Sequence, residues 1–467
     1  MKKIIAIALT IVMIAALAAC GAPAPATPSA PAAPSSAAPA APGVPAAPVG
    51  PVEFTMPTEP ISIAFSWWGN DARREGVEGA INEFTSRYPN VSIEPQVESG
   101  PFAETIEKMI TRLAAGTEAD FNQVNYNWLH VFGQGNNVFA DLRPYANIID
   151  FDAWVPSDLQ LMTLANGEVA GVPHNMNGRV VLYNKTLLAE FGRDTFPTTW
   201  EDMIALGREV AANNTAVDGG NNRHLITIFE NVVTDNISLM LLYSATGKPH
   251  VVDGQLQYTI PEARDMLEKI LEFDQSGTNH DFVNQDPINN EQSTYWTSGR
   301  SGAAYNWISN PNVNAGAFKG GGHEDELGMT EFPMPGGNNV MMVRPGMGHA
   351  MSRNTAHPEV VAYFLNYFYL DPVAVRSVAM LLGAPSAIHA FEILTNDGLI
   401  TGLPALGLDI LNNANVAEMG PLWEDETLRT AVRYRVLDAV RSGSMDLDTA
   451  AAEWVNGQQA ALNLIFS

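Results

Sequence analysis

Four clusters of aromatic side chains stand beside amide and acidic residues in this 467-residue chain. A sugar presents C–H faces, which pack on flat rings, and hydroxyl groups, which pair with amides and carboxylates. This combination of residue types therefore indicates a carbohydrate-binding site. The clusters are Trp67-Trp68-Gly69-Asn70-Asp71, Tyr126-Asn127-Trp128, Tyr295-Trp296 with Tyr305-Asn306-Trp307, and Trp423 followed by Glu424-Asp425-Glu426.

Packing inside a hydrophobic core is the alternative interpretation for each aromatic cluster. Successive side chains of a strand point to opposite faces, so we expect only one of Trp67 and Trp68 to face a ligand. The acidic residues beside Trp423 are also typical of the N-terminus of a helix. At the level of sequence, both interpretations stay open.

Signatures of catalysis are missing from the sequence: it has no Gly-x-Ser-x-Gly elbow, no His-Glu-x-x-His, no Walker loop and no Gly-x-Gly-x-x-Gly after its first apolar run. Glycoside hydrolases use two carboxylates without fixed spacing, so a surface-anchored glycoside hydrolase stays an alternative. The segment His323-Glu324-Asp325-Glu326 has metal-capable side chains, but the glycines on both sides favour a solvated loop. We therefore expect a binding protein with no catalytic residue, cofactor or metal.

The elements that would position the first two clusters follow α/β order. The apolar run 61–68 predicts a buried strand, an amphipathic helix ends before Pro89, and 91–93 predicts a second strand. A third strand is predicted at 121–124. The first two aromatic clusters therefore lie at the carboxyl ends of strands, where α/β proteins place their ligand sites.

Helix start signals continue along the rest of the chain. Thr198-Thr199-Trp200-Glu201 has the pattern of a capping box and predicts a helix through about residue 211. Pro358 is typical of a first helical turn, and the last helix is predicted from about Leu447. The body from about 58 to 467 is too large for one core.

The N-terminus has the features of an exported precursor. Lys2 and Lys3 precede an apolar run, 4–17, that is short for a membrane span. Leu17-Ala18-Ala19-Cys20 resembles a bacterial lipobox, which implies a signal peptide at 1–19 and a lipid on Cys20; a plain signal peptide with a chance cysteine is the alternative. The Ala- and Pro-rich stretch that follows, 20–57, predicts an unstructured tether on the outer face of the cytoplasmic membrane.

Charge and cysteine content exclude several classes of protein. The chain has 25 basic and 51 acidic residues, a net charge of −26, which repels nucleic acid and anionic headgroups. Cys20 is the only cysteine, so an internal disulfide cannot form.

Seven segments, in order along the chain, resemble the extracellular solute-binding proteins of ABC importers, in particular the sugar-binding group that includes the maltose-binding type. They include the opening Ile63-Ala64-Phe65-Ser66-Trp67-Trp68-Gly69, the helix entry Pro197-Thr198-Thr199-Trp200 and the loop Gly383-Ala384-Pro385; the others are 171–173, 181–185, 302–307 and 348–352 with 357–359.

The resemblance implies an α/β fold of type II, with two lobes, a hinge and a ligand cleft between the lobes. Lobe 1 would comprise 58–172 plus 344–385, and lobe 2 would comprise 173–343 plus 386–467. The protein would be a monomer that delivers an oligosaccharide to the permease subunits of the transporter. The residues expected to contact the ligand are Trp67, Trp68, Asn70, Asp71, Tyr126, Trp128, Asn177, Arg179, Phe229, Glu230, Trp296, Tyr305, Trp307, the segment from Arg344 to Gly348, and Trp423.

A different cargo on the same fold is a further alternative. A polyamine would need several carboxylates in the cleft, and Asp71, Glu230 and Asp235 are the candidates. The mixture of aromatic and amide residues favours a sugar over a polyamine.

Overall fold

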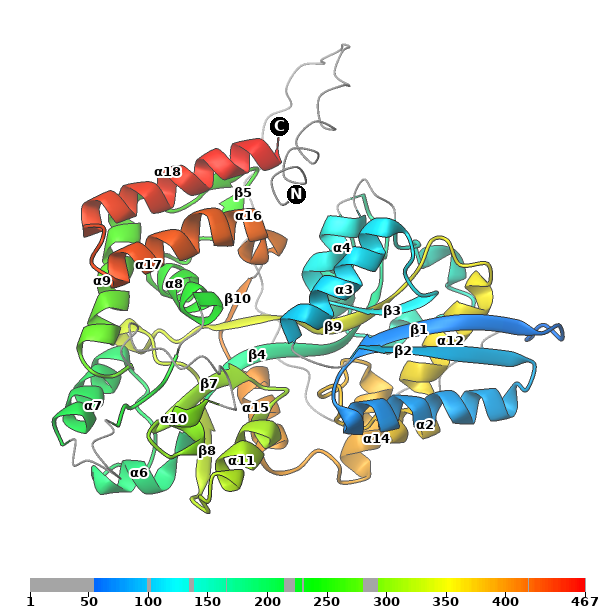
Figure 1. Cartoon of the computed structure of the whole chain (residues 1–467), viewed down its shortest axis with the longest axis horizontal. Coiled ribbons are helices and arrows are strands. Elements are labelled where there is room, and N and C mark those ends of the chain that lie inside the picture. Colours follow the sequence, from blue (N-terminus) through cyan, green and yellow to red (C-terminus); the bar gives the residue numbers. More distant parts are fainter. Residues whose placement is uncertain are drawn as a thin grey trace, which may run out of the picture. The chain divides into compact units, whose positions relative to one another are not determined.

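Strands β4 (Val172–Asn184) and β9 (Met341–Met351) are the longest of the sheet and pair antiparallel near its middle (Figure 1). The computed structural model describes residues 54–98, 102–133, 138–164, 166–213, 223–228, 231–279, 293–418 and 420–466. Within these residues, no helix is long and apolar enough to cross a membrane.

The main sheet has eight strands in the order β2-β1-β3-β9-β4-β7, with β10 beside β9 and β8 beside β4. Strands β1, β2 and β3 run parallel, whereas β9 is antiparallel to both β3 and β4. The remaining strand bounds are β1 Ile61–Trp68, β2 Val91–Glu98, β3 Phe121–Val124, β5 Val251–Val252, β6 Gln255–Leu256, β7 Ala303–Trp307, β8 Leu327–Thr330 and β10 Val416–Glu418.

Helices occupy most of the chain between the strands. The longer ones are α2 Asp71–Arg87, α3 Phe102–Ala115, α4 Tyr126–Gly133, α7 Trp200–Ala212, α8 Asn231–Thr246, α9 Ile260–Gln275, α11 Pro311–Gly320, α12 Pro358–Leu370, α14 Ile388–Asn396, α15 Gly402–Asn413 and α18 Leu447–Ile465. The shorter helical segments are η1 Arg143–Tyr145, η2 Phe151–Ala153, α5 Pro156–Leu161, α6 Lys185–Glu190, α10 Thr294–Thr297, η5 Pro335–Gly337, α13 Pro372–Val378, η6 Pro421–Glu424, α16 Glu426–Leu428, η7 Arg429–Tyr434 and α17 Arg435–Arg441.

The βαβ unit at the start of the body is confirmed. Strands β1 and β2 pair in register from Ile61 opposite Val91, and α2 connects them. The Asn70 side chain caps α2 by accepting a hydrogen bond from Arg73 N at 3.0 Å. The predicted third strand is also present, as β3. The carboxyl ends of β1 and β3 therefore lie at the same edge of the sheet.

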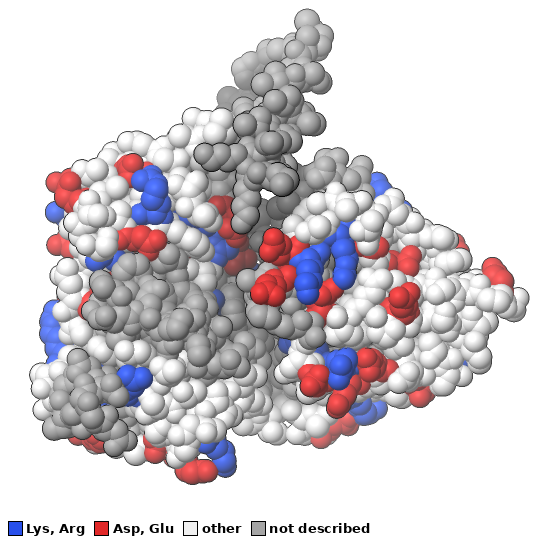
Figure 2. Space-filling view, in the orientation of Figure 1, with Lys and Arg blue, Asp and Glu red and all other residues white. Residues whose placement is uncertain are grey.

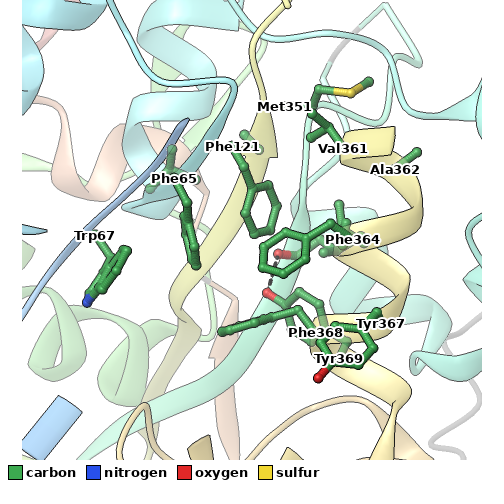
Figure 3. Packing of buried hydrophobic residues seen from close by; sticks show 14 of the residues in the cluster. Phe65, Trp67, Phe121, Met351, Val361, Ala362, Phe364, Tyr367, Phe368 and Tyr369 are labelled. Atoms are coloured by element: carbon green, nitrogen blue, oxygen red, sulfur yellow. Dashed lines mark hydrogen bonds between the residues drawn. The ribbon is translucent and has the colours of Figure 1, made fainter. Parts of the chain in front are cut away.

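The first core is rich in aromatic rings and fixes these strand ends (Figure 3). Phe65 of β1 lies 4.6 Å from Phe121 of β3 between ring centroids, and Phe364 and Phe368 of α12 meet Phe65 edge to face. Such ring pairs add to the free energy gained from burial alone. The first core comprises buried residues between 61 and 172 and between 347 and 394.

A second core contains buried residues between 181 and 454. Trp200 of α7 and Trp454 of α18 are fully buried in it, and the Trp200 ring nitrogen donates to Glu272 at 3.1 Å. Strands β4 and β9 contribute to both cores: Val172 and Met351 belong to the first, Val181 and Met342 to the second. The two cores are therefore linked by the paired strands β4 and β9.

Three boundaries differ from those expected. Phe54, which we placed in the tether, packs on Tyr363 with ring centroids 5.0 Å apart. Helix α14, placed in lobe 2, buries Ala390 and Leu394 in the first core. Helix α7 is capped by Thr199, which accepts from Asp202 N at 3.2 Å, so the cap lies one residue later than the capping-box pattern predicts.

Candidate functional site

Two arginine side chains lie over one tryptophan ring beside the paired strands β4 and β9. The Arg179 guanidinium carbon is 4.2 Å from the Trp307 ring centroid, and that of Arg344 is 4.7 Å from it. Glu424 forms an ion pair with Arg344, with 3.1 Å between Oε2 and Nε. We call these four residues the arginine–tryptophan cluster.

Strand register explains how residues distant in sequence meet here. Arg179 of β4 pairs directly with Trp307 of β7, and Asn177 of β4 pairs with Arg344 of β9. Asn177 and Arg179 are two residues apart, so their side chains lie on the same face of β4. Asn177 also donates to the Ser309 hydroxyl at 3.0 Å and accepts from Ser309 N at 3.2 Å. The register of three strands thus places polar groups and one ring at a single surface.

The electrostatics of the cluster depend on Glu424. Two guanidinium groups over one ring repel each other, and a nearby carboxylate offsets this repulsion. The side chains of Arg344 and Glu424 are only 13% and 7% exposed, so water screens their attraction weakly. The Arg344 Nε–H does not point at the carboxylate, so the pair is a charge contact without a hydrogen bond there.

Glu424 belongs to η6, which a buried ion pair fastens to the second core. Arg433 and Asp235 are both fully buried and form two hydrogen bonds, of 2.7 and 3.0 Å. Arg433 also donates to the main-chain oxygen of Trp423, the residue before Glu424. The Asp235–Arg433 pair therefore sets the position of Glu424.

Helix α4 brings aromatic rings from the first core. Burial, with the charge of Glu424 as a second cause, raises the pKa of the Tyr126 phenol to about 12, whereas Arg344 opposes this shift. Tyr126 is therefore protonated at neutral pH and lies close to the arginine–tryptophan cluster. Trp128 of the same helix packs on Trp68 at the end of β1, with ring centroids 5.7 Å apart.

Arg73, in the first turn of α2, is a further cation beside these rings. Its Nε donates to Leu381 O at 3.0 Å and its Nη1 donates to Trp68 O at 3.2 Å. Burial lowers its pKa to about 10, and within the described residues its guanidinium meets carbonyl oxygens and no carboxylate. Gly69 permits this approach, because a Cβ there would lie 2.4 Å from Arg73 Cδ.

A small cavity of about 40 Å³ with a mixed polar and apolar lining adjoins the cluster. Its lining includes Arg179, Thr227, Ser293 and Asn306. The buried Thr227 hydroxyl has no hydrogen-bond partner among the residues that the structure describes. Because one water needs about 10–15 Å³ of such volume, the cavity has room for a few waters or ligand hydroxyl groups.

Several residues predicted as ligand contacts are core residues instead. Trp67 is 1% exposed and packs 4.8 Å from Phe65. Trp296 is 2% exposed and donates its ring N–H to Asn314 O at 2.8 Å. Trp423 is also buried, at 1% exposure. Core packing is therefore the correct interpretation for Trp67 and Trp423, whereas Trp296 also lines the cavity beside Arg179.

Two further predicted contacts lie in packed surroundings. Tyr305 is buried, and its hydroxyl lies 3.7 Å from Met240 Sδ. Gly348 lies where β9 closely approaches β4, since a Cβ there would be 2.5 Å from Val172 O. Gly348 therefore serves packing, whereas Tyr305 also lines the cavity beside Arg179.

The polar residues after Trp68 have local roles. Asn70 caps α2, and Asp71 pairs with Arg74 at 3.0 Å on the surface. Asp425, between Glu424 and Glu426, caps α16, as the helix-terminus alternative predicts. Phe229, Glu230 and Cys20 lie outside the described residues.

The structure brings together Trp68, Tyr126, Trp128, Asn177, Arg179, Trp307 and Arg344 from the predicted set. Sequence reasoning missed Arg73, Ser309 and the specific role of Glu424. Glu424 could have been found from the sequence because it follows Trp423, one of the predicted aromatic residues. Arg73 and Ser309 belong to no sequence motif that would have identified them.

The acidic loop after α11 has structural partners. His323 stacks on Phe318 at 4.6 Å, Asp325 accepts from Asn184 at 2.8 Å, and Glu326 pairs with Lys185 at 2.5 Å. Among the described residues, no group of three or more His, Cys, Asp or Glu side chains could hold a metal ion.

A family model described as bacterial extracellular solute-binding protein matches residues 70–375. The chain belongs to this family. A relative from Pyrococcus horikoshii, an uncharacterized ABC transporter extracellular-binding protein, is 22% identical over 218 residues, 45% of this solute-binding protein and 47% of that one. An arabinooligosaccharide-binding protein from Halalkalibacterium halodurans is 24% identical over 135 residues, 28% of this chain and 30% of that one. The matched parts thus span half or less of these relatives.

The solved structures include a periplasmic oligogalacturonide binding protein from Yersinia enterocolitica in complex with saturated digalacturonic acid. It is 19% identical, with a TM-score of 0.75, and the likeness covers 87% of this solute-binding protein and 100% of that chain. This likeness confirms the predicted fold class, α/β of the type II solute-binding kind.

Proposed function

We propose that this solute-binding protein captures an oligosaccharide outside the cell and delivers it to the permease of an ABC importer, without catalysing a reaction. The observation that carries the proposal is the set of rings and polar groups around Asn177 on β4. Trp307 is partly buried and supplies an aromatic ring, and Asn177 and Ser309 supply hydrogen-bonding groups. Trp128 is buried against Trp68. The names of the relatives from Halalkalibacterium halodurans and Yersinia enterocolitica, both oligosaccharide binders, support it.

The division between the cores suggests how binding would be signalled. Trp68 and Trp128 belong to the first core, whereas Trp307 packs against the second. We propose that these cores correspond to two lobes and that a ligand contacts both only when they are closed. The ligand then shifts the population toward the closed form, which the permease recognises.

The polyamine alternative has little support in the described residues. Asp235 is buried in the ion pair with Arg433, and Asp71 is an exposed surface residue. Arginines, which repel a polycation, line the candidate site. We therefore retain a carbohydrate as the proposed ligand.

The test is titration of the chain from Val52 with a panel of oligosaccharides, followed by tryptophan fluorescence and calorimetry. A micromolar dissociation constant corresponds to about −8 kcal/mol, which ring stacking and amide hydrogen bonds can supply. Trp307→Ala should weaken binding by about 2 kcal/mol, as loss of a desolvated aromatic contact does, whereas Tyr145→Ala, in η1, should not. Hydrolysis of a bound oligosaccharide would favour the glycoside hydrolase instead.

Membrane anchoring is a separate part of the proposal. We propose that the chain is held at the outer face of the cytoplasmic membrane by a lipid on Cys20 and acts as a monomer. Cys20→Ser should move the full-length protein from the detergent phase to the aqueous phase in a detergent partition assay. Unchanged partitioning would show that Cys20 carries no lipid.

A further inference from the structure

The charge of the candidate site is opposite to that of the whole chain. The chain has 51 acidic and 25 basic residues, and acidic and basic side chains are interspersed on the face in Figure 2. At the site, however, Arg73, Arg179 and Arg344 gather near one stretch of β4, and Glu424 is the carboxylate that contacts Arg344. This concentration of guanidinium groups requires a physical reason, because partly buried cations lose hydration.

Two of these arginines keep a hydrogen-bond donor available. Arg344 donates from Nη1 to Pro345 O at 2.7 Å, and its Nε lies beside Glu424. Arg73 donates from Nε and Nη1 to two carbonyl oxygens. Within the described residues, no hydrogen bond is made by Nη2 of either side chain.

Both side chains border the same stretch of β4, Asn175 to Asn177. Arg344 pairs with Asn177 in the strand register. Arg73 holds the loop before Gly383, and a Cβ on Gly383 would lie 2.3 Å from Asn175 Nδ2. The pKa of His174, the residue before Asn175 in β4, is lowered by burial and also by the charge of the nearby Arg73. Both side chains therefore lie near the segment 174–177 of β4.

The balance of charge indicates the class of ligand. The charge of Arg344 is offset by Glu424, whereas Arg73 contacts no carboxylate in the described part of the chain. Of the three charges on Arg73, Arg344 and Glu424, one positive charge, that of Arg73, is therefore left without an opposite charge among the described residues, which favours an anionic ligand. A planar carboxylate accepts hydrogen bonds from guanidinium groups with good geometry.

We propose that the ligand is an acidic oligosaccharide, whose sugar carboxylate is bound by Arg73 and Arg344, beside the Trp307 ring over which the Arg344 guanidinium lies. This inference rests on the proposed function and narrows its substrate class. A sugar acid gains charge-assisted hydrogen bonds that a neutral sugar of the same shape cannot make. Because these bonds are electrostatic, their contribution should fall as ionic strength rises.

The experiment compares ligands that differ only in the charged group. Calorimetry would measure the affinity of galacturonic- and glucuronic-acid disaccharides, their carboxyl-reduced neutral counterparts, and sulfated counterparts. We expect the acid to bind about 10- to 100-fold tighter than its neutral counterpart, the range that one charged hydrogen bond provides. We also expect this difference in affinity to decrease when the salt concentration is raised from about 0.05 M to about 0.5 M, because salt screens the attraction between the charges.

Substitutions assign the carboxylate to its partners. Arg344→Met and Arg73→Met should each weaken binding of the acid about 10-fold or more and leave binding of the neutral sugar within a few-fold. Arg344→Lys keeps the charge but loses the planar group, so it tests geometry if a methionine variant fails to fold. Arg300→Met is the matched control, because Arg300 also lies over an aromatic ring, 4.0 Å from Tyr295, outside this site.

The possible outcomes separate the two proposals. Equal affinity for an acid and its neutral counterpart would overturn the acidic ligand and leave oligosaccharide binding intact. Tighter binding of the sulfated than of the carboxylated sugar would overturn the carboxylate. Binding of no sugar in the panel would refute the proposed function and this inference with it.

Discussion

The buried ion pair between Asp235 and Arg433 gives the sharpest test of how the site is supported. Both side chains are fully buried, and Arg433 also donates to Trp423 O and to Gln458 at 3.3 Å. In Asp235→Asn the carboxylate charge is lost, while the shape of the side chain is kept. Arg433 then remains as an uncompensated cation in the second core.

The expected cost is about 3–5 kcal/mol, the range for removal of one partner of a buried pair. For a cooperative unit of roughly 200 residues, an unfolding entropy of about 2.1 cal/mol/K per residue gives ~0.4 kcal/mol/K. The midpoint of thermal unfolding should therefore fall by about 10 °C. Replacement of both partners, Asp235→Leu with Arg433→Met, should recover part of this loss, because it removes the uncompensated Arg433 charge, while the buried Arg429, 3.9 Å from Asp235, still loses its contact with that carboxylate.

Differential scanning calorimetry measures the unfolding midpoint of each variant. Far-UV circular dichroism at about 25 °C checks that each variant is folded before it is heated. Asp397→Asn is the matched control: Asp397 also meets an arginine through two hydrogen bonds, to Arg376 at 2.5 and 3.3 Å, but on the surface. It should shift the midpoint little. A fall in Asp235→Asn no larger than in this control would refute the argument from burial.

The remaining predictions concern pH, packing and Glu424. Burial lowers the pKa of His174 and of His250 to about 3. Below about pH 6.5 the unfolded chain therefore binds more protons at these two residues than the folded chain does. The free energy of unfolding should consequently fall as the pH is lowered from about 6.5 toward 3. At pH 5 each of the two histidines should lower the free energy of unfolding by roughly 2 kcal/mol. Urea titrations at pH 7 and pH 5 would measure this loss, and His174→Leu should reduce the difference between the two pH values. Gly348→Ala should destabilise by about 1–3 kcal/mol in the same assay, because its Cβ would lie 2.5 Å from Val172 O. Glu424→Gln should tighten binding of an acidic disaccharide in calorimetry, since it removes the carboxylate beside Arg344; weaker binding would show that Glu424 positions Arg344 instead.

Local patterns predicted the fold well, because the decisive signals lie within short stretches. The apolar run at 61–68 and the helix ending before Pro89 gave β1 and α2, and the chain order gave a parallel first unit. The antiparallel insertion of β9 between β3 and β4 was not predictable in this way. It pairs residues more than 150 positions apart, such as Val172 with His349, and no local pattern reports such a contact.

The site was predicted in part, and the failures share one cause. Composition identifies a tryptophan, but burial depends on which elements cover it: Trp67 and Trp68 are neighbours, yet Trp67 packs on Phe65 and Trp68 packs on Trp128. Arg73 was not among the residues predicted from the sequence. Its role depends on Leu381, about 300 residues later in the chain, whose carbonyl oxygen holds its guanidinium group.

The charge at Arg73 connects ligand choice with the proposed closure. A guanidinium without a carboxylate partner is better hydrated when its surroundings are open than when they are covered. In the closure that we propose, this charge would favour the open arrangement when no ligand is bound, and a neutral sugar would leave that preference unchanged. An anion that meets Arg73 removes it, so the ligand's charge contributes to closure as well as to contact. Selectivity for acidic sugars and the response to binding would then arise from the same residue.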